Sequence, residues 1–256
     1  MTKIAVIGVG HMGKAMIEGF KKADNEIIAQ NPVNPRVSRL AKELDFKLFN
    51  AINDLIAENP EIIILTTPAK VTLQVASQLR NTNEKTIIIS AAAGVTYNDL
   101  KTQLPNQLLA RIIPNTPVAV NQGTIGLYLP ENISSQDHER ITSFLKQLGD
   151  VIAVKEDQLS IVGTIAGCGP AFVDVFLDAL GDSGVLNGLP RKLANNIASS
   201  MVKGAASLAY ESKQAPSLLR DEVCSPGGTT IKGVTSLEKN GFRNAVIEAV
   251  NAANQN

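Results

Sequence analysis

Residues 4–16 read IAVIGVGHMGKAM, an apolar run that leads into three glycines spaced G-x-G-x-x-G. The apolar run predicts a buried strand, and residues 14–22 predict an amphipathic helix. In this setting Gly8 permits a tight turn, Gly10 lets the backbone approach a pyrophosphate, and Gly13 permits close helix–strand packing. The pattern therefore predicts a dinucleotide-binding loop with its anion at the helix N-terminus. A tight turn without a ligand is the alternative.

The rest of the first half repeats this alternation of short aliphatic runs and helix-like segments. Such alternation is typical of βαβ units around a parallel sheet. The predicted strands are 4–8, 26–30, 62–66 and 86–90, and the predicted helices are 14–22, 36–44, 51–58 and 71–79. After Arg111, proline-bearing loops surround a predicted strand at 124–129, a helix at 135–148 and a last strand at 151–154.

Beyond Lys155 the strand signals almost disappear. Helices are predicted at 170–184 and 190–211, and after Pro216, Pro226 and Gly241. Several of them open with proline, which the first helical turn tolerates. The predicted fold class is α/β, an N-terminal Rossmann-like doubly wound sheet followed by an all-α C-terminal domain. The predicted domains are residues 1–153, which bind the dinucleotide, and residues 154–256, which are helical.

The composition excludes several classes of protein. Lys and Arg total 24, as do Asp and Glu, so the formal net charge is zero and we expect no nucleic acid partner. Cys168 and Cys224 have no paired spacing and no histidine cluster, which argues against disulfides and a metal site and favours two buried small residues. No apolar run approaches the length of a membrane span, so we expect no membrane partner and a cytoplasmic location.

The segment AQNPVNPRVSR, residues 29–39, bears on the type of dinucleotide. NAD-binding sites usually place an acidic residue at this distance from the glycines, where it binds the ribose 2′-hydroxyl. Here no carboxylate is present to repel a 2′-phosphate, and the guanidinium groups of Arg36 and Arg39 can reach such a phosphate, which favours NADP. The alternative is that both arginines are solvated helix residues. The sequence supports the two interpretations equally.

Residues 225–230 read SPGGTT and lead into a helix-like segment, residues 231–238. Such a turn can direct several backbone N–H groups and hydroxyls toward one point, a neutral cradle for a carboxylate at a helix N-terminus. The alternative is an N-capping turn, in which Ser or Thr satisfies the free N–H groups. Taken alone, the hexapeptide supports both interpretations equally.

A general base of the kind that alcohol-oxidising dehydrogenases need is not evident. The two histidines are His11, inside the glycine loop, and His138, on a helix predicted to be solvated. A cyclic imine is basic enough to arrive protonated, so hydride can add to it without a protein base. The missing base therefore fits reduction of an imine.

Five segments in order resemble the pyrroline-5-carboxylate reductase family, and the resemblance covers nearly the whole chain. They are 4–16 (IAVIGVGHMGKAM), 90–95 (SAAAGV), 111–117 (RIIPNTP), 167–172 (GCGPAF) and 219–231 (LRDEVCSPGGTTI). The resemblance implies reduction of 1-pyrroline-5-carboxylate to proline by NADPH or NADH, the last step of proline synthesis. It also implies a C-terminal dimerisation and substrate-binding domain that interleaves with a second subunit, so that the SPGGTT turn completes an active site shared in a homodimer. Dimers of this family commonly assemble further, into decamers.

The resemblance also implies roles for individual residues. For the cofactor these are Ile7, Gly8, Val9, Gly10, His11 and Met12 along the pyrophosphate, Asn31 at the adenosine ribose or its phosphate, Asn53, Thr66, Thr67 and Pro68 along the cofactor, and Ala91, Ala92 and Ala93 near the nicotinamide. For the substrate carboxylate they are Ser225, Gly228, Thr229 and Thr230. Thr230 is also the implied hydroxyl partner of the ring nitrogen and so the predicted catalytic residue. Arg36 joins the predicted cofactor-binding residues through the 2′-phosphate interpretation.

The chain departs from the family at two places. The family usually has A-V-K-P after the fourth strand, where this chain has Thr66-Thr67-Pro68, one residue shorter and without the lysine. Cys168 stands where the family has serine, a near-isosteric change. Two alternatives to the implied function stay open: a reductase of another cyclic imine, and a non-catalytic relative that binds nucleotide.

Overall fold

The computed structural model describes residues 1–254 of the chain, which fall into two compact units, Met1–Gly167 and the residues from Cys168 onward. This division lies later than the predicted boundary after residue 153, because the segment that follows the last strand still packs on the sheet. A Cβ added to Gly126 would lie 2.7 Å from a methyl carbon of Val162 in that segment. Nδ2 of Asn115 donates a 3.0 Å hydrogen bond to the carbonyl of Ala166.

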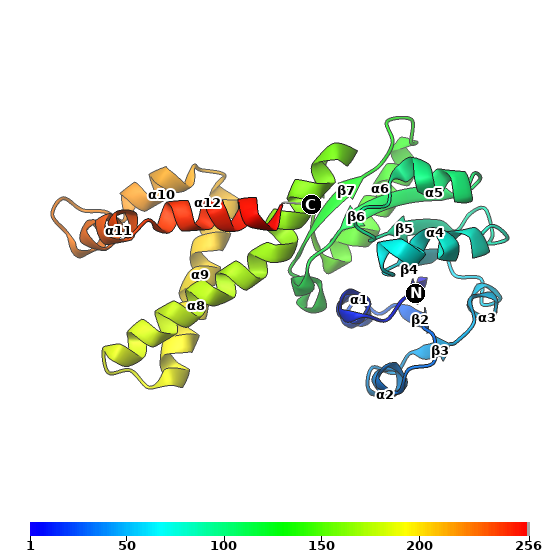
Figure 1. Ribbon diagram of the computed structural model, residues 1–256, viewed down its shortest axis with the longest axis horizontal. Helices are drawn as coiled ribbons and strands as arrows, with labels where there is room; N and C mark the ends of the chain where they lie inside the picture. The colour runs from blue at the N-terminus through cyan, green and yellow to red at the C-terminus, as the bar shows by residue number, and fades with distance from the viewer. Residues whose placement is uncertain (255–256) are drawn as a thin grey trace. The chain divides into compact units, whose positions relative to one another are not determined.

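The first unit is built on one eight-stranded sheet in the order β3-β2-β1-β4-β5-β6-β7-β8 (Figure 1). Neighbouring strands are parallel except β6 and β7, which are antiparallel. The strands are β1 (Lys3–Ile7), β2 (Glu26–Gln30), β3 (Lys47–Phe49), β4 (Ile62–Leu65), β5 (Ile87–Ser90), β6 (Leu108–Ile113), β7 (Gly123–Tyr128) and β8 (Gly149–Ala153). The strand order reverses between β1 and β4, and sheets of this kind bind ligands outside the carboxyl ends of the strands at that point.

Helices cover both faces of the sheet, as the prediction of a doubly wound fold requires. They are α1 (His11–Lys21), α2 (Pro35–Glu43), α3 (Ile52–Ile56), α4 (Ala69–Gln78), α5 (Tyr97–Gln103), α6 (Ser135–Leu145) and α7 (Leu159–Val162), with short helices η1 (Thr116–Val120), η2 (Lys146–Leu148) and η3 (Glu156–Gln158) and the π-helical η4 (Gly163–Cys168). The side chains of α1, α2 and α6 form one core and those of α3, α4 and α5 the other.

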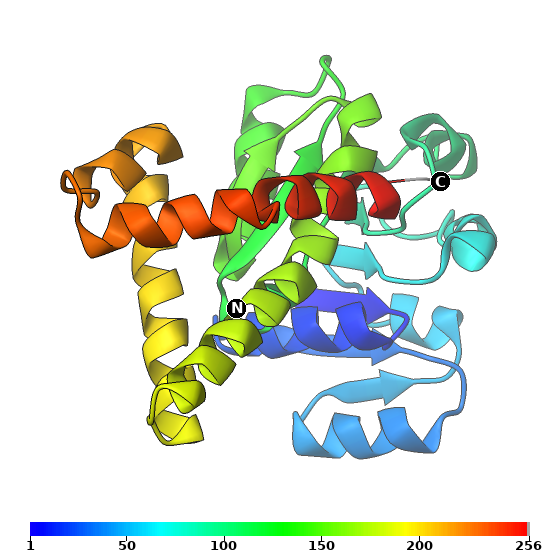
Figure 2. The ribbon, with the colours of Figure 1, turned by 60° about the vertical axis from the view of Figure 1, so that its left-hand side comes forward.

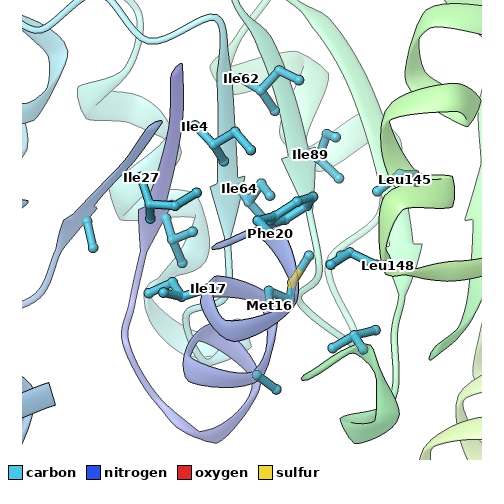
Figure 3. Close-up of a cluster of buried hydrophobic side chains, with 14 of the residues drawn as sticks. Ile4, Met16, Ile17, Phe20, Ile27, Ile62, Ile64, Ile89, Leu145 and Leu148 are labelled. Atoms are coloured by element: carbon cyan, nitrogen blue, oxygen red, sulfur yellow. The ribbon is translucent and has the colours of Figure 1, made fainter. Parts of the chain in front are cut away.

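Successive residues of the central strands enter opposite cores, because side chains alternate across a strand. In β1, Ile4 belongs to the core under α1, whereas Ala5 belongs to the core under α3 and α4. Figure 3 shows the first core, in which Phe20 and Met16 of α1 lie beside isoleucines of the strands. The ring of Phe20 stacks on Phe144 of α6 with centroids 4.8 Å apart. Burial on both faces explains why the strands are continuous aliphatic runs.

The second unit is helical throughout the part that the structure describes, which confirms the predicted all-α region. Its helices are α8 (Gly169–Leu186), α9 (Arg191–Ser212), α10 (Pro216–Glu222), α11 (Thr229–Lys239) and α12 (Phe242–Ala253). Helices α8 and α9 lie against each other (Figure 2), and a Cβ on Gly184 would lie 2.6 Å from the Cβ of Ala194. Phe176 of α8 contacts Phe242 of α12 with ring centroids 5.8 Å apart.

Strands β3 and β6 and helix α5 are among the elements of the first unit that the sequence prediction missed. Strand β3 has only three residues, and helix α5 buries a single side chain, that of Leu100, so neither has a clear apolar period. Strand β6 reads LLARII, and Arg111 interrupts its aliphatic pattern. The structure places β6 between β5 and β7, with Arg111 opposite Ser90 and Tyr128.

The second unit leaves most of its large apolar side chains exposed in the single chain. Among its described residues, only the apolar side chains of Ala194 and Ala198 are buried.

The expectation that no apolar run approaches the length of a membrane span is wrong. The helical stretch 156–186 contains an 18-residue window with a mean hydropathy of 1.6 and, by length and composition alone, could cross a membrane. Helices of soluble proteins can meet the same criterion. The criterion alone therefore does not explain why the apolar side chains of the second unit are exposed.

Candidate functional site

The three glycines of the loop have different structural roles. Gly8 has a φ of 97°, which side chains rarely adopt. A Cβ on Gly13 would overlap the carbonyl oxygen of Gly8, so this glycine lets α1 approach β1. Gly10 has a φ of −79° and a ψ of −159°, open to any residue, and a Cβ there would meet no atom within 4 Å. The fold itself does not need glycine at position 10. Its effect is to leave space above the loop, where a pyrophosphate would approach.

Two side chains hold both backbone groups of Val9. Its N–H donates to Oδ1 of Asn31 over 3.0 Å, and its carbonyl oxygen accepts from Nη2 of Arg36 over 3.0 Å. Asn31 directly follows β2, and Arg36 lies in the first turn of α2. Both residues predicted for the adenosine end of the cofactor therefore contact the glycine loop, and they fix its position relative to the end of β2.

The backbone groups of Gly8 are held as well. Its N–H donates to the carbonyl of Gln30 over 2.9 Å, and its carbonyl accepts from Oγ1 of Thr66 over 2.6 Å. The N–H groups of residues 10–12, by contrast, have no hydrogen-bond partner within the described residues 1–254. No side chain caps α1, and its first turn has no acidic residue. This helix N-terminus is therefore arranged to receive an anion.

A pocket of about 490 Å³ lies beside the loop, at the carboxyl ends of β2 and β4. It contains five residues predicted for the cofactor: Gly8, Asn31, Asn53, Thr67 and Pro68. The sequence interpretation missed its other lining residues: Gln30, Pro32, Asn50, Ala51, Ile52, Val71, Gln74, Val75 and Gln78. The i, i+4 spacing of two glutamines on α4 was the one available signal. Since none of these lining side chains carries a formal charge, the pocket suits a neutral nucleoside.

The residues predicted for the nicotinamide end lie along the same edge of the sheet. Ala91 directly follows β5, and its N–H donates to the carbonyl of Leu65 over 2.8 Å. Ala92 is buried, and Ala93 is exposed. The side chain of Ile7, at the end of β1, is fully buried in the core. The parallel strands β1, β4 and β5 thus bring the predicted residues to one sheet edge.

Residues 225–228 form a β-turn in the second unit. The N–H of Gly228 donates to the carbonyl of Ser225 over 3.0 Å, and Pro226 and Gly227 are the central residues. The φ of 69° at Gly227 and the preceding proline are typical of a type II turn. Helix α11 begins directly after this turn, at Thr229.

The start of α11 is not capped by a side chain, and its first turn has no acidic residue. The alternative of an N-capping serine or threonine is therefore not what the structure shows. A Cβ on Gly228 would overlap Oγ of Ser225, so the Ser225 hydroxyl lies close to the helix start. Thr229 and Thr230 are exposed. The four residues predicted for the substrate share one helix N-terminus that can receive a carboxylate.

The remaining candidate residues do not form a second centre. His11 and His138 are both exposed, on the first turn of α1 and on α6. Residues 1–254 contain no group of three or more His, Cys, Asp or Glu side chains that could hold a metal ion. Cys168 and Cys224 are half-buried rather than buried as predicted. The reason is that the second unit buries few side chains within one chain.

One partly buried ion pair was missed in the sequence interpretation. Arg111 is 6% exposed, and its Nη1 lies 2.6 Å from Oε1 of Glu156, which also accepts the N–H of Tyr97 over 2.5 Å. Burial raises the pKa of the Tyr97 phenol, whose ring lies edge-on to Tyr128. A buried guanidinium needs a paired acceptor. Glu156 therefore holds the start of the segment after β8 against β6.

Comparison with known proteins decides the family. A family model described as pyrroline-5-carboxylate reductase dimerisation matches residues 156–256, and one described as NADP oxidoreductase, coenzyme F420-dependent, matches residues 3–94. The chain is 33% identical over 255 residues to the pyrroline-5-carboxylate reductase of Synechocystis sp., a match that covers 98% of this chain and 95% of that relative. The chain belongs to the pyrroline-5-carboxylate reductase family.

Solved structures of pyrroline-5-carboxylate reductases have the same fold. The 1-pyrroline-5-carboxylate reductase of Streptococcus pyogenes is 31% identical, with a TM-score of 0.82 and coverage of 98% of this chain and 96% of that one. The pyrroline carboxylate reductase of Plasmodium falciparum with NADP bound is 27% identical, with a TM-score of 0.84 and coverage of 99% and 96%. The matched dimerisation region implies a homo-oligomer, which explains the exposed apolar side chains of the second unit.

Proposed function

We propose that this chain reduces 1-pyrroline-5-carboxylate to L-proline with hydride from NADPH, the last step of proline biosynthesis, with NADH as a second donor. The main support for this proposal is that two helix N-termini are suited to bind anions. Helix α1 begins at the glycine loop and α11 at the SPGGTT turn, and neither has a side-chain cap or an acidic residue in its first turn. One suits the pyrophosphate of the cofactor, and the other suits the carboxylate of the substrate.

The residues of the first unit fit NADP. The open space above Gly10 admits a pyrophosphate, the neutral pocket next to it admits adenosine, and the guanidinium of Arg36 is exposed beside Asn31 for a 2′-phosphate. The bound nicotinamide supplies the hydride. Residues 67–68 and 91–93 line the way from the loop to the nicotinamide in this proposal, and Thr66 next to them holds the carbonyl of Gly8.

The residues of the second unit hold the substrate. The hydroxyls of Ser225 and Thr229 and the N–H groups of Thr229 and Thr230 donate hydrogen bonds to the carboxylate. The N–H of Gly228 closes the turn, and its missing side chain leaves the Ser225 hydroxyl unobstructed. The hydroxyl of Thr230 contacts the ring nitrogen and orients the C=N bond toward the nicotinamide. A protonated imine needs no base from the protein, so the exposed positions of His11 and His138 are no obstacle.

We further propose that residues 154–256 form the dimerisation and substrate-binding domain, and residues 1–153 the dinucleotide-binding domain. In the homodimer, the SPGGTT turn completes a shared active site, and dimers assemble further into decamers. The exposed apolar surface of the second unit supports this arrangement. A cytoplasmic location is proposed because both cysteines are free, as in reducing compartments.

A parallel assay tests the proposal. The purified chain is mixed with 1-pyrroline-5-carboxylate, and the oxidation of NADPH and of NADH is followed separately. We expect saturable oxidation that is faster with NADPH. Turnover of a six-membered cyclic imine alone would identify a reductase of another imine. Nucleotide binding without oxidation of either cofactor on any cyclic imine would identify the non-catalytic relative.

A further inference from the structure

We propose that Thr66 is a positioning residue of the glycine loop: its hydroxyl fixes the carbonyl of Gly8, and so directs the N–H groups of residues 10–12, without contacting the cofactor. Thr66 stands in the segment where this chain departs from its family. The inference rests on the proposed function only in that the loop binds a dinucleotide.

The first step is the direction of the Thr66 hydroxyl. Oγ1 lies 2.6 Å from the carbonyl oxygen of Gly8 and 3.2 Å from that of Ile7. A hydroxyl donates one hydrogen, and the carbonyl of Ile7 already accepts the backbone N–H of Thr66 over 3.0 Å. The shorter bond to Gly8 therefore takes the hydroxyl hydrogen.

The second step is the confinement of the Gly8 carbonyl. A Cβ on Gly13 would overlap this oxygen and would lie 2.8 Å from Oγ1 of Thr66. The carbonyl is thus enclosed between the first turn of α1 and the end of β4. Without the hydroxyl it would have no donor within residues 1–254, and the loop would gain freedom at Gly8, where no Cβ restricts the backbone.

The third step separates Thr66 from the cofactor pocket. Its neighbours Thr67 and Pro68 line the pocket beside the loop, whereas Thr66 does not. The hydroxyl of Thr67 has a different partner, Oγ1 of Thr72, at 2.9 Å. Thr66 therefore acts through the loop backbone, and its effect on affinity must be the same for every dinucleotide.

Direct binding measurements test this role. Thr66→Val removes the hydroxyl at constant shape, and Thr66→Ser keeps it. Thr86→Val is the matched control, because the buried Thr86 hydroxyl donates to the carbonyl of Pro60 over 2.8 Å at the amino-terminal end of β5. Dissociation constants for NADPH and NADH are measured by nucleotide fluorescence, and amide hydrogen exchange is measured for residues 7–13 without cofactor.

We expect Thr66→Val to raise both dissociation constants by the same factor, about five- to tenfold, and to speed exchange in residues 7–13. At saturating cofactor kcat should hold, Thr66→Ser should restore binding, and Thr86→Val should lower only the melting temperature. Unequal factors for NADPH and NADH, or a fall in kcat, would show direct cofactor contact. A lowered melting temperature with unchanged binding and exchange would leave Thr66 a merely structural role.

These outcomes are independent of the substrate. If the wild-type chain binds NADPH but turns over no imine, the proposed reaction fails while the role of Thr66 is still decided by the dissociation constants. If the wild-type chain binds neither nucleotide, the loop assignment fails and the inference with it.

Discussion

Nη2 of Arg36 and the carbonyl oxygen of Val9 lie 3.0 Å apart, and this hydrogen bond ties the first turn of α2 to the glycine loop. The guanidinium is exposed and carries further N–H donors, so one side chain can hold the loop and bind a 2′-phosphate at the same time. The two roles have different signatures. Holding the loop affects every dinucleotide, whereas binding the phosphate affects only NADPH.

Arg36→Ala should therefore raise the dissociation constant of NADPH about tenfold and that of NADH about threefold, since only NADPH loses a charge-assisted contact. Arg39→Ala, on an exposed position of the same helix, is the comparison and should change neither constant by more than about twofold. Fluorescence titration with each nucleotide gives the four values. Equal weakening of both nucleotides by Arg36→Ala would mean that Arg36 acts through Val9 alone.

Gly10→Ala and Gly13→Ala should separate binding from folding. A Cβ at position 10 meets no protein atom, so the melting temperature should hold while the methyl group takes space needed by the cofactor. An overpacking cost of about 1–3 kcal/mol corresponds to a loss of up to about a hundredfold in NADPH affinity. At position 13 the Cβ overlaps the Gly8 carbonyl, so both stability and affinity should fall. Unchanged NADPH affinity in Gly10→Ala would argue against a pyrophosphate above the loop.

Thr230→Ala should lower kcat for 1-pyrroline-5-carboxylate about a hundredfold and leave the NADPH dissociation constant nearly unchanged, because it removes a donor from the substrate half of the site. Thr235→Ala on the same helix is the control, since that hydroxyl donates to the carbonyl of Ile231 one turn earlier. Steady-state kinetics and nucleotide titration are both required. Parallel losses of turnover and cofactor binding would contradict the role assigned to Thr230.

Met201→Lys should disrupt the homo-oligomer. Met201 lies on α9 with Leu193 and Ile197 at i, i+4 and i+8 spacing, and all three side chains are about half exposed in the single chain. A charge placed among them would face water only if the subunits separate. Light scattering after size exclusion should show smaller species, whereas Asn196→Lys, on a polar position of α9, should keep the wild-type mass. An unchanged mass for Met201→Lys would place the interface elsewhere.

The parts of the fold predicted correctly are those in which local pattern and burial agree. The aliphatic run at Ile4–Ile7 is central in the sheet and buried on both faces, so a local pattern was enough to identify β1. Strand β6 was missed because it contains Arg111. The buried guanidinium of Arg111 is accommodated in the strand by its ion pair with Glu156, which lies far along the chain. A partner at that separation leaves no mark in the local sequence.

The candidate site shows the same limit. The glycines and the SPGGTT turn were recognised, since their chemistry lies within a few consecutive residues. The hydrogen bonds from Val9 to Asn31 and from Thr66 to Gly8 form because β2 and β4 both end beside β1. Such contacts come from the sheet order and were beyond a linear pattern.

The near absence of buried apolar side chains in the second unit has a thermodynamic consequence. Its folded state belongs to more than one chain, so protomer concentration enters its unfolding equilibrium as a reactant. Dilution then favours dissociation and unfolding, and the melting temperature of the helical unit rises with protein concentration. Two variants of this chain made in one cell would therefore exchange subunits, and the stability of each would depend on the concentration of both.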